Sequence, residues 1–176
     1  MSGDMTKEHL VATLRAERLR WESLLEAVGA ERMTQPGACG AWSVKDVLGH
    51  LAAYLRFWGA QVRGATTGVP PTPQDLFDVE TLPEGAGNWT PEEQNAAIHA
   101  LYADLPPDVV LATWREAFDL LTEGVVTLGD EDVTQAGRFP WAGDRPLAEA
   151  MAGDTYRHAA AHAMEVRGRL DRDVGG

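Results

Sequence analysis

The sequence predicts an all-α protein, a four-helix bundle with a long crossover after the second helix and one extra short helix. Four long stretches repeat apolar residues close to every 3.6 positions. No stretch shows the apolar–polar alternation of a strand bounded by hairpin turns. A long connection rich in proline and glycine follows the second stretch, which is typical of a bundle whose chain crosses between non-adjacent corners. The 176 residues are expected to form one domain, 1–176.

The first two helices are expected over 6–28 and 43–63. In the first, leucine, valine and tryptophan side chains follow the helical period, and Gly29 supplies a stop. The second begins at Ser43, and Asp46 stands at the spacing of a capping box. The segment TQPGACG between the two helices is rich in residues that favour turns.

Residues 64–89 contain several prolines and show no sustained period. A connection of this length inside one domain is either disordered or a functional lid or crossover. A second irregular segment is expected at 129–145. The remaining helices are expected over 90–104, 107–128 and 146–170, each with a proline near its start.

The charge balance is acidic, with 15 Lys and Arg against 27 Asp and Glu and a formal net charge of −12. Such a charge repels phosphate backbones and anionic lipids, so we expect no nucleic acid and no membrane as partner. No stretch approaches the roughly 18 apolar residues of a membrane span, and the N-terminus lacks a signal-peptide pattern. A cytoplasmic protein is expected. Cys39 is the only cysteine, which excludes an internal disulfide and a multi-cysteine zinc cluster.

Several common chemistries lack their motifs in this sequence. There is no G-x-S-x-G around any of the three serines, which argues against a serine hydrolase. The glycine-rich phosphate-binding patterns of nucleotide-binding folds are also missing.

Three histidines form a candidate metal site. His158 and His162 are four positions apart in the last predicted helix, so both imidazoles project from one face. His50 lies at the border of the apolar stripe on the second helix. Each feature has a simpler explanation, because paired histidines occur by chance and His50 alone could be a half-buried core residue. Together, three inward imidazoles suit zinc, nickel, iron or copper, with a fourth position left for water.

Two motifs carry a family resemblance. W-S-V-K-D-V-L-G-H-L (Trp42 to Leu51) and H-A-A-A-H-A-M-E-V-R (His158 to Arg167) resemble the DinB/YfiT-like superfamily. That group includes thiol-dependent transferases and mycothiol-dependent maleylpyruvate isomerases. The resemblance spans nearly the whole chain, and there is some likeness to DfsB/ClbS-type proteins in the 91–104 helix and the Trp141 segment.

The resemblance implies the metal ligands and the chemistry. The family's ligand positions fall on His50, His158 and His162, where some members have Glu in place of His158. A divalent transition metal (Zn, Ni or Fe) would then activate a low-molecular-weight thiol or water for transfer to, or hydrolysis of, a small electrophilic compound. The further C-terminal domain of the isomerases is not expected here. The alternative is a non-catalytic stress or resistance bundle that sequesters a small molecule, and a homodimer is possible in either case.

Carboxylates near the histidines are candidates for supporting or catalytic roles. Asp154 and Asp46 each precede a proposed ligand by four residues and could accept its second ring N–H. Asp46 could instead serve only as the helix cap, and Asp154 could pair with Arg157. Glu165 could act as an acid/base or an extra ligand, or could simply be a solvated charge. We expect Cys39 to be structural or incidental.

Basic and aromatic residues could bind a substrate or cosubstrate above the ion. Arg56 and Arg157 could hold a carboxylate, although each could be an ordinary surface residue. Trp89 and Trp141 lie in irregular segments and, with Trp58, could wall a pocket, although Trp58 is most simply core. A lid built from 64–89 and 137–145 is our hypothesis for the cover of this pocket.

Overall fold

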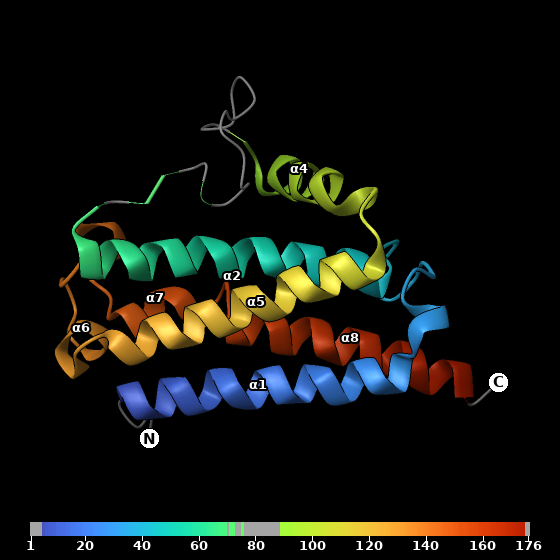
Figure 1. The fold of residues 1–176 in the computed structure, drawn as a ribbon, viewed down its shortest axis with the longest axis horizontal. Coiled ribbons are helices and arrows are strands. Elements are labelled where there is room, and N and C mark those ends of the chain that lie inside the picture. Colours follow the sequence, from blue (N-terminus) through green and yellow to red (C-terminus); the bar gives the residue numbers. More distant parts are fainter. Residues whose placement is uncertain (1–4, 70, 73–74, 76–88, 175–176) are drawn as a thin grey trace.

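The computed structural model describes residues 5–69, 71–72, 75 and 89–174, and it confirms the all-α class. Within these ranges there is no strand, and only Cys39 and Trp42 form an isolated β-bridge. Figure 1 shows the long helices stacked as a bundle. They are α1 (Lys7–Val28), α2 (Val44–Thr67), α5 (Pro107–Thr127) and α8 (Tyr156–Val174).

The predicted crossover follows α2. Helices α2 and α5 run in the same direction and share the most extensive contact in the molecule (Figure 1). In the chain, α4 (Pro91–Ala103) comes between these two helices, and it runs back along the outer side of α2. Helix α1 packs on α5 and α8, and α8 also contacts α2, so each long helix touches two others.

Polar side chains cap the starts of two long helices, and the cap at Ser43 is the one that the sequence predicted. The Thr6 hydroxyl accepts from the backbone N–H of His9 at α1, and Ser43 with Asp46 forms the full capping box at α2. Helix α2 continues to Thr67, beyond the predicted end at 63, and stops at Gly68, whose φ of 74° lies in the left-handed region.

Two contacts dock α4 on α2 beside the predicted metal ligand. A Cβ placed on Gly49 would lie 2.7 Å from Cγ of Tyr102, so the α4 ring packs directly on the α2 backbone. The ammonium group of Lys45 donates to the backbone carbonyls of Ala103 and Leu105, which caps the C-terminal end of α4. The turn of α2 that leads to His50 is therefore covered.

The last helix is broken, in contrast to the single helix expected over 146–170. It consists of α7 (Leu147–Ala152), a turn, and α8. Gly153 and Asp154 favour a helix interior poorly, and the Asp154 N–H turns back to the carbonyl of Met151. The Thr155 hydroxyl is buried and donates to the same carbonyl, which holds the break in place.

The predicted irregular segment 129–145 also contains local helix. It carries α6 (Asp130–Thr134) and a 3₁₀ turn, Pro140–Ala142. Another 3₁₀ turn, Ala30–Arg32, follows α1. These pieces are too short for a periodic apolar pattern to reveal them.

The core is centred on α1, α2 and α5. Its largest fully buried side chains include Trp21, Trp114 and Phe118. At the edge of this core, the Arg115 guanidinium donates to both carboxylate oxygens of Glu22, at 2.8 and 2.7 Å, and joins α5 to α1. None of the helices in the described ranges combines the length and hydropathy needed to span a bilayer.

One buried charge in α1 predicts a pH-dependent stability. Glu17 is 6% exposed, and burial raises the pKa of its carboxyl despite the opposing charge of Arg20, 3.3 Å away. The ionised form is therefore disfavoured in the folded state, so stability falls as pH rises from the unfolded pKa to the raised folded value. Glu17→Gln should stabilise the protein by on the order of 1 kcal/mol at pH 7 and by nothing below about pH 4.

Urea denaturation of both proteins across this pH range measures the difference. The exposed Glu26→Gln on the same helix is a matched control and should show no such pH-dependent gain. A Glu17→Gln effect that is the same at pH 4 and pH 7 would contradict the prediction.

Candidate metal centre

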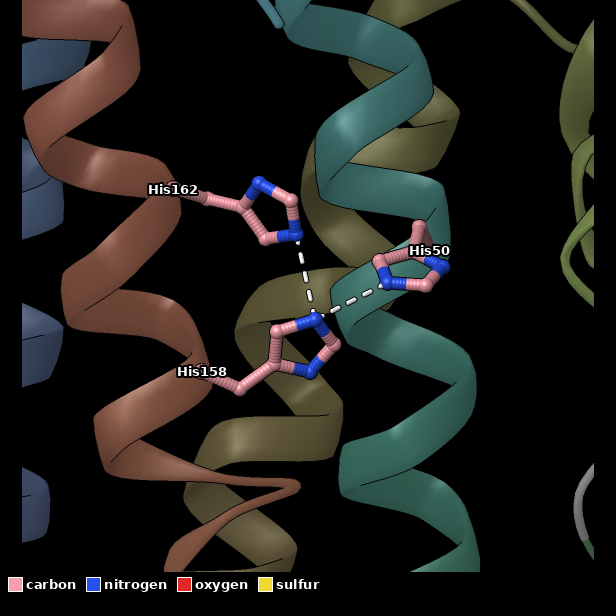
Figure 2. Close-up of side chains that lie close together, drawn as sticks. All are labelled: His50, His158 and His162. Atoms are coloured by element: carbon pink, nitrogen blue, oxygen red, sulfur yellow. Dashed lines mark hydrogen bonds between the residues drawn. The ribbon is translucent and has the colours of Figure 1, made fainter. Parts of the chain in front are cut away.

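The three predicted ligands lie together between α2 and α8 (Figure 2). Nε2 of His158 is 3.0 Å from Nε2 of His50 and 3.1 Å from Nε2 of His162. His158 and His162 project from one face of α8, and His50 faces them from α2 (Figure 2). The same nitrogen of every ring therefore points to one small region.

This spacing fits ligation of a single ion. Metal–nitrogen bonds of about 2.0–2.1 Å place two ligand nitrogens roughly 2.9–3.4 Å apart at octahedral or tetrahedral angles. The two Nε2 distances, 3.0 and 3.1 Å, fall in that interval. Hydrogen bonds alone explain the cluster less well, because one ring proton on His158 could serve only one of its two neighbours. The donor set is suitable for a divalent transition metal.

Burial keeps two of the rings neutral, the form that binds metals. His50 is 3% exposed, and burial, followed by the charges of His158 and His162, lowers its pKa to about 3. Burial and His162 likewise lower the pKa of His158, while Asp154 acts in the opposite direction.

The far edge of the His162 ring is held by Glu165 and Cys39. Nδ1 of His162 lies 2.9 Å from Oε2 of Glu165, and Sγ of Cys39 lies 2.6 Å from the same oxygen and 3.4 Å from Nδ1. Burial and the Glu165 carboxylate raise the pKa of the Cys39 thiol to about 12, so the thiol is a proton donor. The bond from Cys39 in turn lowers the pKa of Glu165, and His162 adds to this.

Cys39 thus contacts the candidate site, although the sequence suggested only a structural or incidental role. It lies in the Cys39–Trp42 turn, where the N–H groups of residues 37–39 all point to the Trp42 carbonyl. Gly40 in this turn has φ of 58°, a conformation that favours glycine. The Trp42 ring at the other end of the turn lies 5.0 Å from the His50 ring and stacks on His99.

A tyrosine, Tyr54, and a carboxylate, Asp154, border the histidines on another side. The Tyr54 ring lies 5.0 Å from the His50 ring and 5.1 Å from the His158 ring. Asp154, in the turn before α8, accepts a 3.1 Å hydrogen bond from the indole N–H of Trp58. Burial raises the pKa of Tyr54, and the Asp154 carboxylate adds to the effect. Tyr54 was not singled out from the sequence, but its position one turn after His50 is the signal that could have found it.

The sequence left two alternatives for the partners of Asp46 and of Asp154. Asp46 caps α2, and its Oδ1 lies 3.5 Å from Nε2 of His99, so it does not take the suggested place behind His50. Asp154 binds Trp58, while the Arg157 guanidinium lies over the Tyr156 ring.

Two of the three tryptophans that were predicted to wall a pocket lie in contact with each other. Trp141 lies 6.5 Å from Trp58 and stacks on Phe139 at 5.0 Å. Trp89 is half-buried against the core, and Arg56 is half-buried on α2. Of the hypothetical lid, residues 70, 73–74 and 76–88 lie outside the described residues.

Solved structures share this fold at low sequence identity. The sibling lethal factor precursor DfsB aligns at TM-score 0.75 and 16% identity over 96% of each chain. An uncharacterised protein from Escherichia coli UTI89 aligns at TM-score 0.77 and 12% identity over 98% of this chain and 97% of that one. The colibactin self-resistance protein ClbS, solved in complex with double-stranded DNA, aligns at TM-score 0.63 and 16% identity over 96% of each chain. At these identities the likeness shows the fold.

The ClbS complex corrects one inference from the sequence. We expected no nucleic-acid partner because the net charge is −12, yet a bundle of this fold has been solved with DNA. The exclusion was wrong because net charge describes the whole chain, whereas contact with DNA depends on the charges of one local surface.

Sequence comparison assigns the family. A search among curated proteins finds no significant match. The family model described as "Mycothiol maleylpyruvate isomerase N-terminal domain" matches residues 14–167, which include all three histidines and most of the bundle. The chain therefore belongs to the mycothiol maleylpyruvate isomerase N-terminal domain family, within the DinB/YfiT-like superfamily.

Proposed function

We propose that this protein is a metal-dependent enzyme that activates a low-molecular-weight thiol or water. The activated group would be transferred to, or would hydrolyse, a small electrophilic compound. The observation that carries the proposal is that three Nε2 atoms from two helices lie together. Nε2 of His158 is 3.0 Å from that of His50 and 3.1 Å from that of His162. The family match supports a thiol, since its description names mycothiol.

His50, His158 and His162 would hold a divalent transition metal, with zinc, nickel and iron as the candidates. When bound, such an ion acts as a Lewis acid and lowers the pKa of a thiol or water toward about 7. Three protein ligands would leave a coordination position for a thiol or water, which is the property of catalytic rather than structural sites.

The residues around the cluster would supply the remaining functions. Asp154 would accept a proton from the thiol or water, a role supported by the Trp58 indole, which holds its carboxylate, and by its electrostatic effect on His158 and Tyr54. Glu165 faces the far side of His162, so a positioning role suits it better than direct proton transfer. Trp58, Trp89 and Trp141 would wall the substrate pocket, and Arg56 and Arg157 would bind a carboxylate of the thiol or substrate.

Elemental analysis and a conjugation assay test this function. Protein purified without a histidine tag should contain one transition-metal ion per chain. With mycothiol or glutathione and a fluorogenic alkylating probe, it should accelerate thioether formation, and chelation should abolish the rate. A protein without stoichiometric metal, or one whose rate is indifferent to chelation, would contradict the proposal.

A non-catalytic resistance protein is the second candidate function. The fold likeness to the colibactin self-resistance protein ClbS favours it. It would bind its small molecule without turnover, so tight stoichiometric binding of an electrophile with no metal-dependent reaction would identify it. A cytoplasmic location and a homodimer remain predictions.

A further inference from the structure

A single turn contacts the candidate metal ligands of both helices. At one end of the Cys39–Trp42 turn, the indole ring of Trp42 packs on the His50 ring of α2. At the other end, the Cys39 thiol meets Glu165 and His162 of α8. We propose that Cys39 and Glu165 are positioning residues that hold His162 in the tautomer whose Nε2 is free to bind the metal. This inference rests on the proposed metal site and extends it to the loop before α2.

The tautomer follows from the placement of the partners. Nε2 of His162 points to His158, whereas Nδ1 lies 2.9 Å from Oε2 of Glu165. A carboxylate oxygen can only accept, so the ring proton belongs on Nδ1. The Nε2 lone pair is then available to a metal, and the bond to the carboxylate fixes the plane of the ring.

Cys39 holds the carboxylate in that position. Glu165 is on the exposed side of α8, where a glutamate would ordinarily sample several rotamers. The Cys39 thiol reaches the same Oε2 atom that faces His162, and the turn that carries Cys39 is fixed by its hydrogen bonds to Trp42. The thiol therefore reduces the freedom of a residue that would otherwise be mobile.

A cation at Cys39, His162 and Glu165 is the competing explanation. These three residues also bring a ligand atom each to within 4.8 Å of one another. A cation on Nδ1 would require the His162 ring to lose its only remaining proton while Nε2 serves the first site. The hydrogen-bonded arrangement needs no such loss, and we favour it for that reason.

Zinc affinity and ring tautomer together test the inference. In a competition titration of Zn²⁺ against a chromophoric chelator, Glu165→Ala should raise the Kd by roughly 10–100-fold, as loss of an outer partner of a ligating histidine does. Cys39→Ala should weaken binding in the same direction by less, and Cys39→Ser, which keeps a donor, should restore most of the loss. The exposed Glu116→Ala on α5 removes the same charge elsewhere and should leave the Kd unchanged.

Long-range ¹H–¹⁵N spectra of the metal-free protein give the second readout. His162 should carry its proton on Nδ1 in the wild type and should shift toward the Nε2–H form in Glu165→Ala, which a merely structural role would not cause. Unchanged tautomer and Kd in Glu165→Ala would overturn the inference. So would two zinc ions per wild-type chain with one lost in Cys39→Ala. A wild type that binds none of zinc, nickel and iron would refute the proposed function, and the tautomer would then decide the inference alone.

Discussion

Replacing His158 with alanine is expected to abolish stoichiometric metal binding. Its Nε2 atom is the one that approaches both other ligand nitrogens, at 3.0 and 3.1 Å. The variant keeps two ligands on separate helices, and the loss in affinity should exceed the roughly 10–100-fold that removal of an outer partner costs. Elemental analysis and the zinc competition titration measure the effect.

His9→Ala provides the matched control for this experiment. His9 is exposed on α1, and only its backbone N–H contributes to the helix cap. Metal content and zinc Kd should therefore equal those of the wild type. Retention of one tightly bound ion in His158→Ala would show that these three rings are not the ligand set.

Trp21→Ala should lower the free energy of unfolding by about 3–5 kcal/mol, more than any other substitution described for this protein. The Trp21 side chain is fully buried and packs against Trp114 with ring centroids 6.0 Å apart. Its indole N–H donates to the Ala159 carbonyl at 3.0 Å, next to His158, so α1 holds the segment of α8 that carries two of the candidate ligands. Trp21→Phe keeps most of the packing and should lose about 1 kcal/mol from the hydrogen bond.

Urea denaturation gives the free energy of unfolding for each variant. Leu19→Ala, two positions away on the same helix and 68% exposed, should stay within about 0.5 kcal/mol of the wild type. A Trp21→Ala loss no larger than that of Leu19→Ala would contradict the assignment of Trp21 to the centre of the core.

Local sequence signals were sufficient for the helices and the histidine cluster. The 3.6-residue period located the long helices, and Ser43 with Asp46 marked the start of α2 at the observed residue. The four-residue spacing of His158 and His162 was enough to place both rings on one face of α8. These features depend on residues close together in the chain, which is why the sequence could predict them.

Contacts between distant segments could not be predicted in this way. The meeting of Cys39 with Glu165 joins a turn to the middle of α8, 126 residues further along the chain, and no periodicity encodes it. The break before α8 was missed because Gly153 and Asp154 lower helix propensity only modestly, and tertiary contacts such as Asp154 to Trp58 decide the outcome. The lining of the site depends on the same long-range contacts.

The absence of a side chain at Gly49 limits how the crossover helix can move. Because the Tyr102 ring rests on the backbone directly before His50, α4 cannot slide along α2 without meeting this turn. A displacement of α4 would therefore disturb the backbone next to His50, the candidate ligand on α2, and even one methyl group at position 49 would force the Tyr102 ring away from α2. The glycine in the L-G-H-L sequence is thus a steric requirement of helix docking, and it ties the position of α4 to the turn of α2 that carries His50.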